Sequence, residues 1–195
     1  MDLLSNAGNR TLHFNNDQGR FDGREVTFPF EVIARNIGIE DIHNPGQVPA
    51  SSNNTYIFAG VQIHVVDSEI PTSSHVVVGH RGSHSSTVEG KNTVNGSSSV
   101  DDAGANILPN ARADLRIVGN ADRTLTVYWQ VPNTSGNTAN DHWELYRGNG
   151  TLLGNAPNFG PSVYAGIITY AYFDAGVPFR GAADSFEIIE LDQYY

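Results

Sequence analysis

The chain has 195 residues, and its 11 Lys plus Arg against 21 Asp plus Glu give a formal net charge of −10. That length suits one domain with a sizeable core, and the acidic balance argues against nucleic acid and anionic lipid, which attract basic surfaces. The absence of Cys excludes disulfide frameworks, thiolate metal sites and Cys nucleophiles, and no apolar run approaches the ~18 residues of a membrane span.

Apolar and polar residues alternate with a period of two along much of the chain, which is typical of half-buried β-strands. This pattern predicts strands over 26–35, 56–66, 76–78, 113–118, 125–131, 143–146, 163–173 and 185–191. Turn-forming residues at 120–122 and 148–150 predict hairpin connections, and a helical turn is expected over 39–42. Residues 89–106 carry few apolar side chains and are predicted to form a long loop. The spacing indicates an all-β fold, an antiparallel sandwich or barrel of one domain.

The same alternation separates a core face of each strand from an opposite face. Trp129 is in phase with Val127 and is expected in the core. The opposite face is rich in tyrosine, amide, histidine and carboxylate side chains, which stack on sugar rings or hydrogen-bond to hydroxyl groups. Such a face suits a glycan and suits a peptide equally well; the alternative is that exposed tyrosine only reflects β-propensity. The candidate ligand-binding residues on it are Gln62, His64, Tyr128, Gln130, Tyr170, Tyr172 and Asp174.

Three histidines surround Arg81 in the segment from His75 to His84. Because His75 and His80 fall on opposite faces of a regular strand, we expect them to be exposed polar residues rather than metal ligands. Arg81 lies at the end of a predicted strand and is a candidate donor to a carboxylate or a sugar hydroxyl. A glycoside hydrolase needs two facing carboxylates, and no alternating run of acids provides them, so that activity is not expected.

Three segments resemble the concanavalin A-like jelly rolls, which include laminin-G-like lectin modules and alginate-lyase-type polysaccharide lyases. They are residues 60–64 (Gly-Val-Gln-Ile-His), 143–146 (Trp-Glu-Leu-Tyr) and 172–176 (Tyr-Phe-Asp-Ala-Gly). The resemblance implies a two-sheet jelly roll. In a lyase, Gln62 would neutralise a uronate carboxylate, while His64 and Tyr172 would act as base and acid for β-elimination. Asp174 stands where the lyases carry Lys, which adds negative charge where a polyuronate would lie and disfavours binding of such a polymer.

The low lysine content, the absence of Cys and the acidic balance resemble the ligand-binding domains of large calcium-dependent bacterial surface adhesins of the RTX type. This resemblance implies a non-catalytic, monomeric module for a cell-surface glycan or peptide, extracellular, without membrane insertion, over residues 1–195 of a larger chain. A divergent polysaccharide lyase, a structural spacer without ligand, and a full-length intracellular protein are the alternatives.

Calcium is the expected cofactor, either structural or bridging to the ligand, because acidic side chains supply the oxygen atoms that Ca²⁺ prefers. Asp184 precedes the last predicted strand, where related jelly rolls place a structural calcium ligand. Asp101 and Asp102 lie in the predicted long loop and are further candidates. The alternative is that these acids are solvated loop residues.

Overall fold

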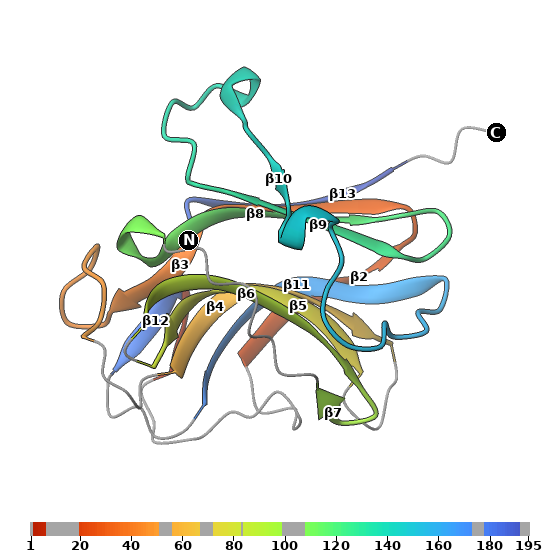
Figure 1. The fold of residues 1–195 in the computed structure, drawn as a ribbon, viewed down its shortest axis with the longest axis horizontal. Coiled ribbons are helices and arrows are strands. Elements are labelled where there is room, and N and C mark those ends of the chain that lie inside the picture. Colours follow the sequence, from red (N-terminus) through yellow and green to blue (C-terminus); the bar gives the residue numbers. More distant parts are fainter. Residues whose placement is uncertain are drawn as a thin grey trace.

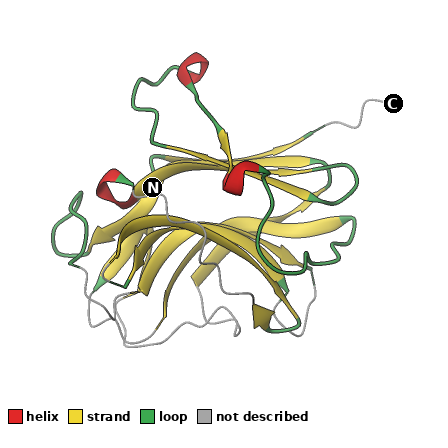
Figure 2. Ribbon diagram, viewed as in Figure 1, coloured by secondary structure: helices red, strands yellow, loops and turns green. Residues whose placement is uncertain are grey.

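The computed structural model describes residues 2–6, 20–50, 56–66, 72–82, 84–98, 108–172 and 178–191. Its fold is a sandwich of two antiparallel β-sheets, which confirms the predicted all-β, jelly-roll class (Figure 1). Figure 2 shows that strands dominate the described residues and that the helical segments are short. These are the 3₁₀ turns η1 (Pro109–Ala111), η2 (Thr138–Asn140) and η3 (Tyr146–Gly148).

Each sheet is assembled from strands that lie far apart in the sequence. One sheet has seven strands in the order β1-β12-β3-β8-β9-β10, with β13 also paired to β3, and the other has six in the order β2-β11-β4-β5-β6-β7. The strands of the seven-stranded sheet are β1 (Asp2–Asn6), β3 (Phe30–Asp41), β8 (Arg112–Gly119), β9 (Leu125–Gln130), β10 (Glu144–Leu145), β12 (Phe179–Ala182) and β13 (Ser185–Glu190). Those of the six-stranded sheet are β2 (Arg20–Thr27), β4 (Tyr56–Val65), β5 (Ser73–Arg81), β6 (His84–Val94), β7 (Ser97–Ser98) and β11 (Ser162–Tyr172).

The core lies between the two sheets and is filled by alternate residues of the central strands, as the period of two predicts. Burial of this apolar surface is the main stabilising contribution to the sandwich. Trp129 belongs to this core, as expected. Typical buried members from both sheets are Phe30, Val32, Ile57, Val61, Ile63, Val76, Leu115, Ile117, Val127 and Val163.

The predicted strand over 26–35 is two strands in different sheets. β2 ends at Thr27 and β3 begins at Phe30, on either side of Pro29. Proline has no backbone N–H and cannot continue a ladder, so the chain crosses from the six-stranded to the seven-stranded sheet at this point. The helical turn expected over 39–42 is wrong, because β3 continues to Asp41 and pairs with β12.

The predicted long loop over 89–106 is wrong for its first part. Residues 89–94 complete β6, whose neighbour is β5, and a turn at Asn95 and Gly96 leads into β7. Residues 99–107 lie outside the described part of the chain. The turn at 120–122 connects β8 to β9 as predicted, whereas 148–150 closes the turn of η3, where the N–H of Gly150 donates to the carbonyl of Tyr146 at 2.8 Å.

Glycine lets the six-stranded sheet arch with its concave side turned away from the core (Figure 1). Four neighbouring strands carry a glycine on that side: Gly23, Gly166, Gly60 and Gly79. A Cβ atom at Gly60 would stand 2.2 Å from the carbonyl oxygen of Val76, and one at Gly79 would stand 1.9 Å from that of Ile57. Any side chain at these positions would push the neighbouring backbones apart.

We therefore expect Gly60→Ala to lower the free energy of unfolding by about 1–3 kcal/mol, the usual cost of overpacking. Urea unfolding followed by far-ultraviolet circular dichroism measures this change. Gly160→Ala is the matched control, because its Cβ would lie 3.8 Å from the carbonyl oxygen of Ser162, an ordinary contact. Equal stability of the two variants would contradict the role assigned to Gly60.

Candidate functional site

The concave face of the six-stranded sheet brings together predicted residues from three strands. Gln62 and His64 belong to β4, Tyr170 and Tyr172 to β11, and Arg81 to β5. In the antiparallel register, Tyr56 lies opposite Tyr172 on one side and opposite Arg81 on the other. Because side chains alternate between faces, Gln62, His64, Tyr170 and Arg81 occupy the side away from the core. The side chain of Tyr172 lies outside the described part of the structure.

Next to them lies a buried polar cluster, which we define as His75, Arg81, Glu89, Lys91 and Tyr170. Four members are almost inaccessible to solvent, with exposed fractions of 1% for His75, 5% for Glu89, 4% for Lys91 and 1% for Tyr170. The phenol oxygen of Tyr170 lies 3.4 Å from His75 Nε2 and donates to Glu89 Oε1 at 3.4 Å. Glu89 also faces two cations, Lys91 Nζ at 3.9 Å and Arg81 Nε at 3.5 Å.

An apolar strip borders the buried polar cluster on the same concave face. Phe58, Val77 and Ile168 pack with Tyr170 in a small hydrophobic group that is separate from the main core. The rings of Phe58 and Tyr170 are 5.1 Å apart at their centroids. Tyr56 packs against this group and is partly exposed, as are His64 and Arg81, so the face offers aromatic and hydrogen-bonding groups that a sugar or a peptide can use.

Burial sets the protonation of two members of the cluster. Loss of hydration, followed by the positive charge of Lys91, holds the pKa of His75 well below its usual value. Burial, followed by the negative charge of Glu89, raises the pKa of Tyr170 well above its usual value. Both side chains are therefore neutral at neutral pH. Ionisable groups are costly to bury, and their concentration on a face that does not form the core is typical of a functional site.

Three members of this cluster were not identified from the sequence. His75 and His80 were expected to be exposed, but both are buried, His75 on the concave face and His80 towards the core, because β5 lies between β4 and β6. Glu89 and Lys91 were assigned to the long loop. The signal that could have located them is the alternation of Val88, Gly90 and Asn92 with charged residues, which continues the strand pattern.

Tyr128 and Gln130 do not join the concave face. Both lie on β9, which belongs to the seven-stranded sheet, and they point away from the core on the opposite side of the molecule. The expectation that they line one groove with Gln62 and Tyr170 is therefore wrong. The period of two indicates which side of a strand is buried, but it does not say which sheet the strand joins.

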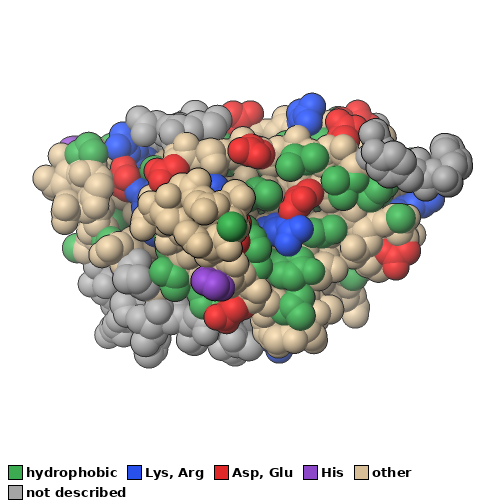
Figure 3. Space-filling view, turned by 90° about the horizontal axis from the view of Figure 1, so that it is seen from above, with side chains coloured by type: hydrophobic (Ala, Val, Ile, Leu, Met, Phe, Trp, Pro, Cys, Tyr) green, Lys and Arg blue, Asp and Glu red, His purple; other side chains and the backbone are tan. Residues whose placement is uncertain are grey.

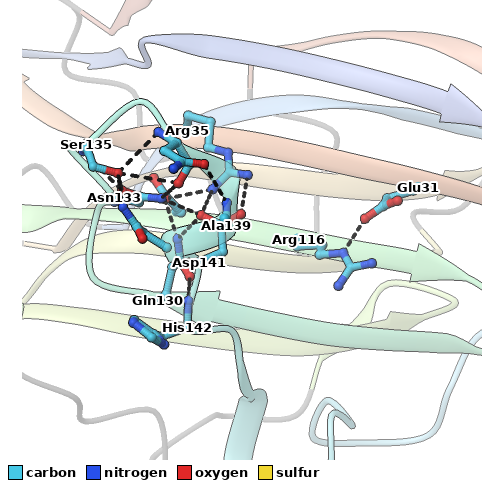
Figure 4. A network of polar contacts seen from close by, with 12 residues as sticks. Glu31, Arg35, Arg116, Gln130, Asn133, Ser135, Ala139, Asp141 and His142 are labelled. Carbon is cyan, nitrogen blue, oxygen red and sulfur yellow. Dashed lines mark hydrogen bonds and ion pairs between the residues drawn. The ribbon is translucent and has the colours of Figure 1, made fainter.

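On the outer side of the seven-stranded sheet, Gln130 belongs to a network that holds the loop between β9 and β10 (Figure 4). Its Nε2 donates to Asp114 at 2.8 Å and to Asp141 at 3.1 Å, and its Oε1 accepts from the N–H of His142 at 2.7 Å. Arg35 donates two bonds to Asp141, at 2.9 and 2.8 Å. The hydrogen bonds from Arg35 are the main reason that the pKa of Asp141 lies far below its ordinary value. Bonds from Asn133 and Gln130 lower it further, whereas burial acts in the opposite direction. Gln130 thus has a structural role.

Tyr128 lies on the same outer surface. The guanidinium of Arg116 stands 5.0 Å from the centroid of the Tyr128 ring and 5.9 Å from that of Trp143, and it pairs with Glu31. Figure 3 looks down on this surface and shows charged side chains of both signs among hydrophobic ones. Two cations of this sheet, Arg35 and Arg116, are each paired with carboxylates.

The predicted metal ligands remain a prediction. Asp184 is exposed, and its carboxylate accepts a hydrogen bond from Asn36 Nδ2 at 3.1 Å. In the described ranges, no three His, Cys, Asp or Glu side chains gather as a metal site would need. Asp101, Asp102 and the ligand candidate Asp174 lie outside those ranges.

None of the helices in the described part of the chain has the length and apolar character that would span a bilayer. A scan against protein-family models found no match, and neither did a search of curated proteins.

Solved structures do match the chain. A mutant of the GH43 protein BlXynB from Bacillus licheniformis aligns with a TM-score of 0.61 at 13% identity, over 92% of this chain and 31% of that one. A xylan β-1,4-xylosidase from Bacillus halodurans C-125 aligns with a TM-score of 0.57 at 14% identity, over 92% of this chain and 31% of the xylosidase. The chain thus spans about a third of either protein, and at these identities the likeness concerns the fold.

The Emp47p carbohydrate recognition domain aligns over 97% of this chain and 94% of that domain, at 10% identity and a TM-score of 0.47. At this TM-score the likeness is not evidence for a shared fold.

The buried, neutral His75 makes stability depend on pH. In the unfolded chain its imidazole takes up a proton below about pH 6.5, whereas the folded protein resists protonation, so the stability present above that pH is lost as the pH falls. We expect the free energy of unfolding to fall between pH 7 and pH 5, by at most about 1.4 kcal/mol per pH unit for this group. Urea unfolding at several pH values measures the slope.

His75→Gln should flatten this slope, and His142→Gln should not, because His142 is exposed. An unchanged slope in the His75 variant would disprove this assignment.

Proposed function

We propose that this domain binds a glycan through the concave face of its six-stranded sheet. The observation that carries the proposal is the buried polar cluster on a face that takes no part in the core. The accessible member of the cluster is Arg81, whose side chain is 29% exposed; its guanidinium can donate to sugar hydroxyls and is held by the buried carboxylate of Glu89 at 3.5 Å. The neighbouring Tyr56, which is partly exposed, supplies aromatic surface for the C–H face of a sugar ring.

The comparisons support this class of ligand in a general way. Of the two bacterial structures that match, one is a GH43 protein and the other a xylan β-1,4-xylosidase. We extend from those names to this chain only the proposal that its ligand is a carbohydrate.

The finer parts of the proposal are that the domain is a monomeric, extracellular module of a larger bacterial surface adhesin and that calcium is needed for binding. Their support is compositional: a charge of −10, no Cys and a single Lys. Calcium would order segments around the concave face or bridge to ligand oxygens, with Asp184, Asp101 and Asp102 as the proposed ligands.

Binding to a mixed glycan and peptide array, in millimolar calcium and again in chelator, tests the ligand class and the calcium dependence together. We expect glycan hits, and Gln62→Ala and Arg81→Ala should weaken them at least tenfold, which corresponds to about 1.4 kcal/mol. Tyr128→Ala on the opposite sheet is the matched control and should bind normally. Blank arrays, or loss of binding in the Tyr128 variant alone, would overturn the proposal for the concave face.

A second candidate function is polysaccharide lyase activity by β-elimination. It is favoured by one observation, the position of Gln62 and His64 on the same face of β4, away from the core. In this reaction a base removes the proton at C5 of a uronate, the C4–O4 bond breaks, and an acid protonates the departing oxygen. His64 would serve as base with Gln62 at the carboxylate, whereas Tyr172, the acid expected from the sequence, lies opposite Tyr56, eight residues along β4 from His64, which is too far to act on the same bond.

The product carries a C4–C5 double bond that absorbs in the ultraviolet, so incubation with a panel of polyuronates tests this candidate. A lyase would give rising absorbance that His64→Ala abolishes and Tyr128→Ala leaves unchanged. Flat traces for every polymer, with glycan binding retained, would eliminate the lyase and leave the binding proposal in place.

A further inference from the structure

A cavity lies in the seven-stranded sheet, where β3, β8 and β12 come together. Its volume is about 940 Å³, near the upper end of the roughly 300–1,000 Å³ typical of ligand pockets. Its walls come from the bulge of β3, the loop that follows β3, η1, the loop after β9 and the turn between β12 and β13. No residue of the concave face contributes to it.

The charged groups of this cavity are paired within the protein. Glu40 accepts two bonds from Arg180, at 2.9 and 2.7 Å, and a further bond from Arg112. Arg112 also donates to the backbone carbonyls of Asn36 at 2.8 Å and Ala182 at 3.0 Å. The cavity is thus lined by two cations, Arg112 and Arg180, and two anions, Glu40 and Asp184. An anionic ligand would therefore meet no net positive charge here, and the two carboxylates would repel it.

Uncharged polar groups and apolar side chains make up the rest of the lining. Asn36, Gln47, Asn110 and Thr134 offer amide and hydroxyl groups, each able to donate and to accept. Ile39, Val48, Val131 and Pro132 form an apolar wall, and Val131 is 54% exposed.

The backbone at two of these polar residues, Asn36 and Gln47, is fixed by hydrogen bonds. The loop that carries Gln47 is tied down by a bond from the N–H of Asp41 to the carbonyl of Gln47 at 2.9 Å. Asn36 and Asn110 have φ angles of 48° and 59°, in the left-handed region that non-glycine residues seldom adopt. The N–H of Asn36 is fixed by a 2.7 Å bond to Asp114. Such pre-organised, strained backbone is characteristic of binding sites.

We infer that this cavity binds a neutral, hydroxyl-rich ligand, the end of an uncharged oligosaccharide. The amide, hydroxyl and internally paired charged groups can hydrogen-bond to sugar hydroxyls, and the apolar wall can pack against sugar C–H groups. The inference goes beyond the proposed function, because the two sites lie on different sheets and neither requires the other.

Amide chemical shifts of the ¹⁵N-labelled protein, titrated with xylotetraose, cellotetraose and mannotetraose in turn, locate the bound sugar. We expect at least one of these probes to shift the amides of Asn36, Gln47 and Asn110. Gln47→Ala should weaken that binding at least threefold, and Val131→Trp, which adds bulk at an exposed position of the wall, should weaken it at least tenfold. Gln62→Ala on the concave face is the control and should leave these shifts unchanged.

Shifts confined to β4, β5 and β11 would overturn the second site while supporting glycan binding on the concave face. An absence of shifts with all three probes would overturn the inference, and the array experiment would still decide the proposed function. Normal binding by a folded Val131→Trp variant would also overturn it.

Discussion

The close approach of backbones across the six-stranded sheet is the constraint on which the candidate site depends. Gly23 faces Gly166 across β2 and β11, and Gly60 and Gly79 continue the series into β4 and β5. Because these positions lack a side chain, the neighbouring strands come close and the sheet can arch. The arch turns the side chains of β5, β6 and β11 towards one another, so groups such as Tyr170 and Glu89 meet although 81 residues separate them.

Much of the fold follows from local pattern. Alternation predicted β4, β8, β9, β11 and β13 and the correct core face of β4, because each has an apolar side that must leave water. The predictions were wrong where residues distant in the sequence decide which strand forms and which sheet it joins. Pro29 divides one apolar run between two sheets, and Ile39 joins a strand through its distant partner Gly181. Such pairings follow from long-range packing that a local pattern does not contain.

The candidate site was less predictable than the fold. The sequence places Gln62, His64 and Tyr170 on one outward face, and the structure agrees, although Tyr170 lies opposite Phe58, six residues along β4 from His64. Gln130 was assigned to the same groove because its strand has the same period, yet that strand belongs to the other sheet. Lys91 was missed for a different reason: a charged residue that is buried against Glu89 has the sequence appearance of a loop. Buried functional charges are thus poorly visible to patterns based on hydrophobicity.

Lys91 is also the sole lysine in the chain, and only 4% of it is exposed. A protease that cuts after lysine needs several residues of unpaired backbone, but β6 is held in a ladder with β5 and carries β7 on its other side. Such an enzyme can cut the chain at one bond alone, and only after β6 has separated from its neighbours. The rate of appearance of the two fragments would then report how often the sheet opens at the strand that carries the buried charges. Cleavage after Lys91 would therefore measure the local unfolding of the six-stranded sheet at β6.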